Sequence, residues 1–105
     1  MKIGVVTLFP DLVRGALQQG VLGRALERGL ATVQTEDPRS HAQDAHRTVD
    51  DRPYGGGPGM VGTPGPWAAA IDAAAAGLPE GALRLHLSAQ GEPLTQRRVK
   101  ELAAS

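Results

Sequence analysis

The chain of 105 residues has no cysteine and only three aromatic residues. The missing cysteines exclude disulfides, thiolate nucleophiles and zinc sites with sulfur ligands, and they favour a cytoplasmic protein. With one Phe, one Tyr and one Trp, the core has to be built from Leu, Val, Ile and Ala, so we expect it to be thin. A thin core in one domain of this length suggests that a partner or a further segment completes it.

The chain also has no net charge, because 11 basic residues balance 11 acidic ones. This balance excludes the broad positive field of an autonomous nucleic-acid-binding domain, so any contact with nucleic acid has to be local. Of the basic residues only Lys2 and Lys100 are lysines, and the other nine are arginines. That bias suits bidentate contacts to phosphate or carboxylate, and GC-rich coding explains it equally well.

No membrane segment or leader is expected at the N-terminus. The apolar run there is only about half a dozen residues long, whereas a membrane span needs about 20. Pro10 and Asp11 end it directly. We therefore expect no membrane partner.

Apolar periodicity predicts an α/β fold, with a parallel sheet and flanking helices. Strands are expected at 2–8, buried on both faces, at 30–36, nearer an edge, and at 82–87. A helical pattern begins at Phe9 and Pro10, with Gly20 dividing two short helices. Thr63 is the expected N-cap of a third helix, Gly77 its C′ residue, and a last helix begins at Thr95.

Residues 37–62 form a long polar and then glycine-rich connection. Connections of about 25 residues are uncommon in compact domains and are usually functional or disordered. The glycines at 57, 59 and 62 fit a dinucleotide-binding pattern, but no strand precedes them, and no lysine follows them as a P-loop requires. Basic neighbours of His41 and His46 disfavour a metal site, and no serine occupies a nucleophile elbow. Two interpretations of this connection remain. It is either a loop that closes over a flat polar ligand or a solvated loop with internal salt bridges.

Four stretches resemble, in order and spacing, the bacterial tRNA (guanine-N1)-methyltransferases of the SPOUT superfamily. They are "IGVVTLFPDL", "GVLGRALERGL", "HRTVDDRPYGGGPGM" and "LSAQG". The resemblance spans essentially the whole chain and implies a homodimeric enzyme with a trefoil-knotted α/β domain. It also implies methyl transfer from S-adenosylmethionine to N1 of the guanine immediately 3′ of the tRNA anticodon. Guanine N1 carries a proton at neutral pH, so a general base has to remove it.

The resemblance also assigns residues to two sites. The cofactor-binding turn is assigned to His86, Leu87, Ser88, Ala89 and Gln90. The guanine-binding loop is assigned to Asp50, Arg52, Tyr54, Gly55, Gly56, Gly57, Pro58 and Gly59. Glycine suits such a loop because a planar base can approach the backbone where no Cβ intervenes. Arg24 and Arg28 are weaker candidates for contacts to the tRNA backbone.

This chain departs from the family pattern in the cofactor turn and at its end. The family usually has proline in place of Ala89 and an aromatic residue in place of His86. Family members continue past the point that corresponds to Ser105, into a segment that closes the knot and a C-terminal domain that supplies the general base. We therefore expect the N-terminal part of a methyltransferase domain, with no catalytic residue and no metal ligand of its own, and no methyl transfer by residues 1–105 alone. A divalent cation in the complete reaction stays open.

Two other classes of function are compatible with the residues. A nucleotide-binding module would hold phosphates at the glycines of 55–59. A non-catalytic fragment would associate with itself through an exposed sheet edge. Competition by ATP would favour the former, and self-association without cofactor affinity the latter.

Overall fold

A two-stranded parallel sheet forms the centre of the computed structural model, which describes residues 1–105. Strand β1 (Lys2–Val6) pairs with β2 (Thr32–Glu36) in a register that sets Lys2 opposite Thr32. Both strands lie where the β-branched segments predicted them. The expected burial of β1 on both faces is wrong, since Ile3 is 40% exposed. With β2 as its only neighbour, β1 is an edge strand.

Two short helices connect these strands, as predicted. Helix α1 (Pro10–Leu17) begins with a proline, whose fixed φ suits the first helical position. Helix α2 (Gly20–Glu27) begins at Gly20, whose φ of +60° lies in the left-handed region that favours glycine. The guanidinium of Arg14 donates a 2.8 Å hydrogen bond to the hydroxyl of Thr35, which ties α1 to β2.

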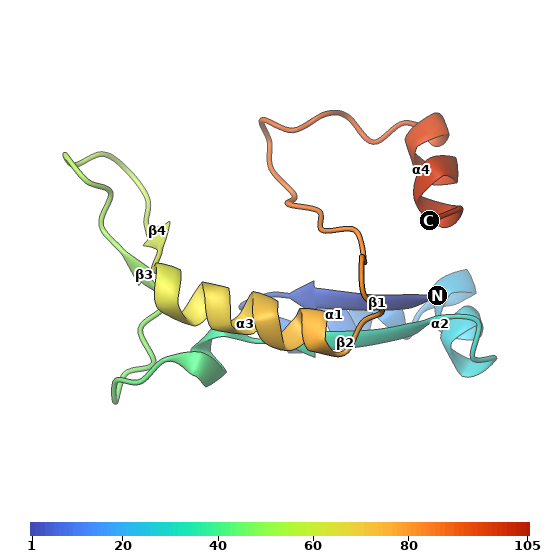
Figure 1. The fold of residues 1–105 in the computed structure, drawn as a ribbon, viewed down its shortest axis with the longest axis horizontal. Helices are drawn as coiled ribbons and strands as arrows, with labels where there is room; N and C mark the ends of the chain where they lie inside the picture. The colour runs from blue at the N-terminus through green and yellow to red at the C-terminus, as the bar shows by residue number, and fades with distance from the viewer.

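Helix α3 (Pro64–Ala76) covers the sheet face opposite α1, so the strands lie between helices (Figure 1). Ala70 on this helix is fully buried, and Gly4 on β1 faces Ala74 closely enough that a Cβ there would meet its methyl group at 3.6 Å. The predicted start at Thr63 is confirmed. Gly77, however, is the C-cap, with a φ of −84°, so its predicted position at C′ is wrong.

The connection 37–62 contains more regular structure than its composition predicts. A 3₁₀ helix, η1 (Pro38–His41), packs against α3 with Pro38 fully buried. The guanidinium of Arg39 donates a 2.7 Å hydrogen bond to the carbonyl of Leu8 beyond β1. Strands β3 (Asp50–Asp51) and β4 (Val61–Gly62) then pair antiparallel and form a short hairpin stem.

Residues 82–87 do not form the predicted third strand. The segment is extended but pairs with no other strand, and Leu83, Leu85 and Leu87 are all exposed. Alternation of apolar residues supplies a strand-like surface, but a strand also needs neighbouring backbone to accept its hydrogen bonds. Figure 1 shows this segment leaving the sheet and arching toward α4 (Gln96–Ala103). The predicted start of α4 is confirmed, since the hydroxyl of Thr95 accepts a hydrogen bond from the backbone N–H of Arg98.

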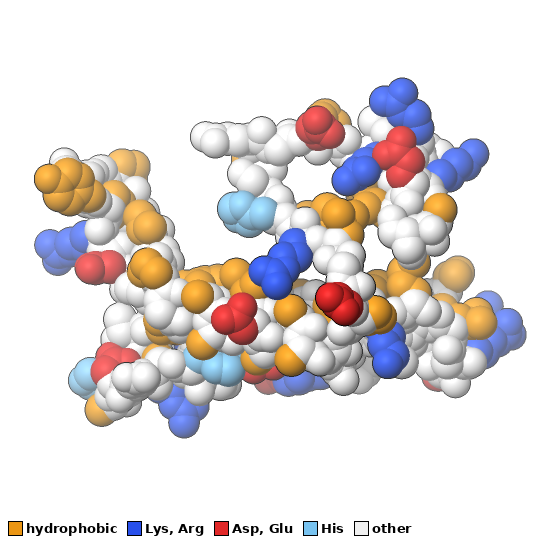
Figure 2. Space-filling view, viewed as in Figure 1, with side chains coloured by type: hydrophobic (Ala, Val, Ile, Leu, Met, Phe, Trp, Pro, Cys, Tyr) orange, Lys and Arg blue, Asp and Glu red, His pale blue; other side chains and the backbone are white.

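The core is thin, as the composition predicts. Four residues are buried, namely Gly23, Pro38, Val49 and Ala70. The radius of gyration of 15.8 Å exceeds the roughly 13 Å of a compact domain of this length. Figure 2 shows apolar side chains on the visible surface, over the hairpin tip and beside α4. No helix combines the length and the apolar character that crossing a lipid bilayer requires.

Candidate functional site

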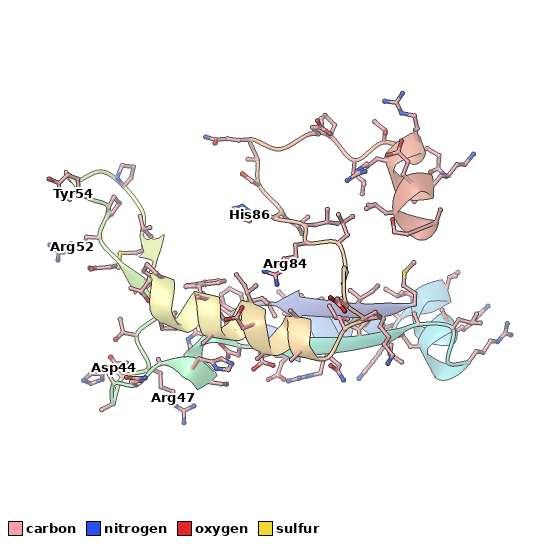
Figure 3. All side chains as sticks on the ribbon, in the orientation of Figure 1. Asp44, Arg47, Arg52, Tyr54, Arg84 and His86 are labelled. Atoms are coloured by element: carbon pink, nitrogen blue, oxygen red, sulfur yellow. The ribbon has the colours of Figure 1, made fainter.

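The glycine-rich loop 52–60 projects from the β3–β4 stem at one end of the molecule (Figure 3). Four of its glycines have a left-handed φ, of +83° to +118°. These are Gly55, Gly56, Gly57 and Gly59. A Cβ built on any of the four would meet no atom within 4 Å. The loop therefore presents open backbone to any flat ligand.

The predicted guanine-loop side chains lie on and around this loop. Asp50 lies in the stem opposite Gly62 and is half-buried. Arg52 and Tyr54 project into solvent near the tip (Figure 3). Inside the loop, the N–H of Gly56 donates to the carbonyl of Pro53 at 3.1 Å. The N–H of Arg52 donates to a carboxylate oxygen of Asp51 at 2.7 Å.

Two residues outside the predicted site sets, Val49 and Trp67, anchor the stem. The carbonyl of Val49 accepts hydrogen bonds from the N–H of Thr63 and from Nε1 of Trp67, each at 2.8 Å. Val49 is only 3% exposed. Trp67 is conspicuous in the sequence only as the single tryptophan of a chain poor in aromatics, which does not indicate its contact with Val49.

A hydrogen-bonded turn precedes the stem. The hydroxyl and the backbone N–H of Thr48 both donate to the carboxylate of Asp44, and these hydrogen bonds lower the pKa of Asp44 below its ordinary value of 3.8. Within this turn Arg47 has a φ of +51°, which is uncommon for a residue with a Cβ. The chain therefore enters β3 from a defined conformation.

The predicted cofactor turn lies in the extended segment after α3. The carbonyl of Ser88 accepts from the N–H of Gly91 at 3.0 Å, and its hydroxyl accepts from the N–H of Gln90 at 3.2 Å. An open cavity of about 350 Å³ lies between this segment and α4. It is lined by Leu85, His86, Leu87, Ser88, Gly91, Glu92, Pro93, Leu94, Arg98 and Leu102. Its volume is near the lower end of the range of small-molecule pockets, and four of its lining residues are leucines.

The structure brings together only part of the predicted cofactor set. His86, Leu87 and Ser88 line the cavity, whereas Ala89 and Gln90 do not. The cofactor turn and the glycine loop lie apart, as the positions of His86 and Tyr54 show (Figure 3). Arg24 and Arg28 are exposed on α2 and at its C-cap. Nowhere do three or more His, Asp or Glu residues gather as they would around a metal ion.

The whole chain matches one protein family. A sequence model described as "tRNA (Guanine-1)-methyltransferase TrmD" matches residues 1–105. The tRNA (guanine-N(1)-)-methyltransferases of Salmonella newport strain SL254 and Salmonella typhimurium strain LT2 are each 51% identical over 105 residues. The aligned region is 100% of this chain and 41% of each relative. The chain thus spans less than half the length of these curated relatives.

Proposed function

Because this chain belongs to the tRNA (guanine-1)-methyltransferase family, we propose that it is part of an enzyme that methylates N1 of guanine in tRNA. The methyl donor is S-adenosylmethionine, and the target is the guanine immediately 3′ of the anticodon. The enzyme acts as a cytoplasmic homodimer, and residues 1–105 form the N-terminal part of its knotted methyltransferase domain.

The glycine loop carries this proposal. A purine ring has two flat faces, and it can approach a backbone closely only where no Cβ projects toward it. Gly55, Gly56, Gly57 and Gly59 offer such backbone, with open space around each Cβ position. In the proposed complex the peptide groups of the loop contact the guanine, and Arg52 and Asp50 supply a charged donor and an acceptor beside it.

The turn after residue 85 is the proposed cofactor site. S-adenosylmethionine supplies an electrophilic methyl group on a sulfonium. His86, Leu87 and Ser88 already line a cavity whose leucines suit the adenine, and Ala89 and Gln90 follow directly in the turn. The role that we assign to these residues is binding and orientation of the methyl donor, which in-line transfer requires.

Methyl transfer by the native gene product tests the proposal. The purified product is incubated with S-adenosylmethionine carrying a labelled methyl group and with a tRNA transcript that has guanine 3′ of the anticodon. The matched control transcript carries adenine at that one position. We expect label in the first transcript and none in the second. Equal labelling of both, or of neither, would overturn the proposed function.

Binding to residues 1–105 separates this proposal from a nucleotide-binding module. We expect S-adenosylhomocysteine to displace bound S-adenosylmethionine and ATP not to displace it. The reason is that the proposed pocket recognises adenosine and an amino acid rather than phosphates. Competition by ATP alone would favour the phosphate-binding alternative.

A further inference from the structure

The junction between the glycine hairpin and α3 is the best-anchored part of the loop region. The Val49 carbonyl receives two hydrogen bonds of 2.8 Å, one from the backbone of Thr63 and one from the indole of Trp67. Thr63 directly follows the hairpin, and Trp67 lies in the first turn of α3. The Val49 carbonyl, just before β3, therefore binds both Thr63 after β4 and Trp67 in α3.

Gly62 and Trp67 are fitted to each other. A Cβ on Gly62 would lie 2.6 Å from Nε1 and 2.9 Å from Cδ1 of Trp67, distances that real Cβ contacts essentially never show. The φ of Gly62 is not in the left-handed region, so backbone conformation does not require glycine there. The close approach of the indole ring does.

Beyond this junction the loop has little to hold it. The stem has only two residues in each strand, and residues 54–60 are all exposed. Helix α3, in contrast, packs against β1, β2 and η1. The direction in which the loop leaves the molecule is thus determined where the stem meets this helix.

We propose that Trp67 is a positioning residue, which acts through Val49 and Gly62 to orient the glycine loop toward its ligand. The indole donates the hydrogen bond that holds Val49, and its ring lies against the backbone of Gly62. That the oriented ligand is guanine rests on the function proposed above; the coupling of Trp67 to the loop stem does not.

Hydrogen exchange at the stem tests the coupling without any activity. Amide exchange of peptides that cover residues 49–63 is measured by mass spectrometry in the native gene product and in its variants Gly62→Ala, Trp67→Phe and the double variant. Gly62→Ala should accelerate exchange about tenfold, because the indole is displaced and a hydrogen bond is lost. The double variant should exchange more slowly than Gly62→Ala, since the smaller phenyl ring leaves room for the new methyl group.

Gly65→Ala is the matched control. It makes the same substitution three residues away, in α3, where a Cβ would meet nothing within 4 Å. We expect exchange at the stem to stay as in the native protein. If Gly62→Ala behaves like Gly65→Ala, or if the effects of Gly62→Ala and Trp67→Phe are additive, the positioning role is wrong.

Steady-state kinetics then connect the stem to the ligand. Trp67→Phe keeps an aromatic ring but removes the N–H donor, so the KM for tRNA should rise about tenfold while kcat changes less than about twofold. A fall in kcat at constant KM would contradict the proposal that Trp67 orients the loop. If the native protein transfers no methyl group, the proposed function fails, while the exchange experiment still decides whether Trp67 positions the loop.

Discussion

The carboxylate of Asp44 accepts two hydrogen bonds from one residue, Thr48. The backbone N–H of Thr48 donates to Oδ1 at 2.7 Å, and its hydroxyl donates to Oδ2. Both hydrogen bonds stabilise the charged carboxylate, and they lower the pKa of Asp44. They also close the turn in which Arg47 takes its left-handed conformation.

Replacing Thr48 with valine should raise the pKa of Asp44 part of the way to its ordinary value. The hydroxyl is the larger cause of the lowered pKa and is lost, whereas the backbone hydrogen bond can remain. NMR titration of the Asp44 carboxyl carbon measures this pKa. Thr32→Val on the exposed side of β2 is the control and should leave the Asp44 titration unchanged.

The same hydrogen bonds give stability a defined dependence on pH. The folded pKa of Asp44 lies below the unfolded one, so the carboxylate contributes stability at pH values above about 4. That contribution is lost as the pH falls through the folded pKa. Thr48→Val should therefore reduce the loss of stability on acidification. Parallel curves of unfolding free energy against pH for both proteins would contradict this.

Gly23→Ala should destabilise the fold. Gly23 is buried, and a Cβ there would lie 2.6 Å from the carbonyl oxygen and 2.8 Å from the carbonyl carbon of Gln18, which are backbone atoms that cannot rotate away. We expect a loss of about 1–3 kcal/mol in urea denaturation. Gly15→Ala in α1 is the control, because a Cβ there would meet nothing within 4 Å. It should be neutral or stabilising.

Two threonines at helix N-caps should respond oppositely to valine. The Thr63 hydroxyl is buried without a hydrogen-bond partner, so Thr63→Val should raise the free energy of unfolding by about 1 kcal/mol. The Thr95 hydroxyl accepts from the N–H of Arg98, so Thr95→Val should lower it by about 1 kcal/mol. Thermal denaturation compares the two variants. A loss of stability in Thr63→Val would show that its hydroxyl finds a partner in solution.

If the glycine loop binds the target guanine as proposed, Gly59→Ala in the native gene product should impair tRNA binding with little effect on global stability. Its φ of +83° costs an alanine about 1–2 kcal/mol, which the exposed loop relieves by changing conformation. We expect a several-fold rise in the KM for tRNA. Gly29→Ala is the matched control, since Gly29 has a φ of +73° and equally open surroundings but follows α2, away from the loop. An equal rise in KM in both variants would contradict a specific role for the loop.

Local patterns predicted most of the regular elements. Pro10, Gly20 and Thr95 mark helix ends through their own backbone and hydrogen-bonding chemistry, and each helix begins where they indicate. The segment 82–87 carries an equally clear alternation and forms no strand. Pairing depends on a second backbone that lies elsewhere in the sequence, so alternation alone could not decide it.

The candidate site could likewise be predicted only in part. The glycines of 55–59 indicate an open loop from composition alone, because only glycine takes left-handed φ values without strain. The anchor of that loop could not be foreseen, since Val49 meets Trp67 through a hydrogen bond across 18 residues. The acceptor is the backbone carbonyl of Val49, and because every residue carries such a group, residue type does not mark it.

The sequence by itself determined the family, the points where the helices begin and the open character of the glycine loop, because these depend on residue identity and neighbours along the chain. The tertiary structure alone decided that Val49 binds the indole of Trp67, that residues 82–87 form no strand, and that the glycine loop and the cofactor turn lie apart. These features depend on distances between segments remote in sequence, and such distances are determined by how the segments pack.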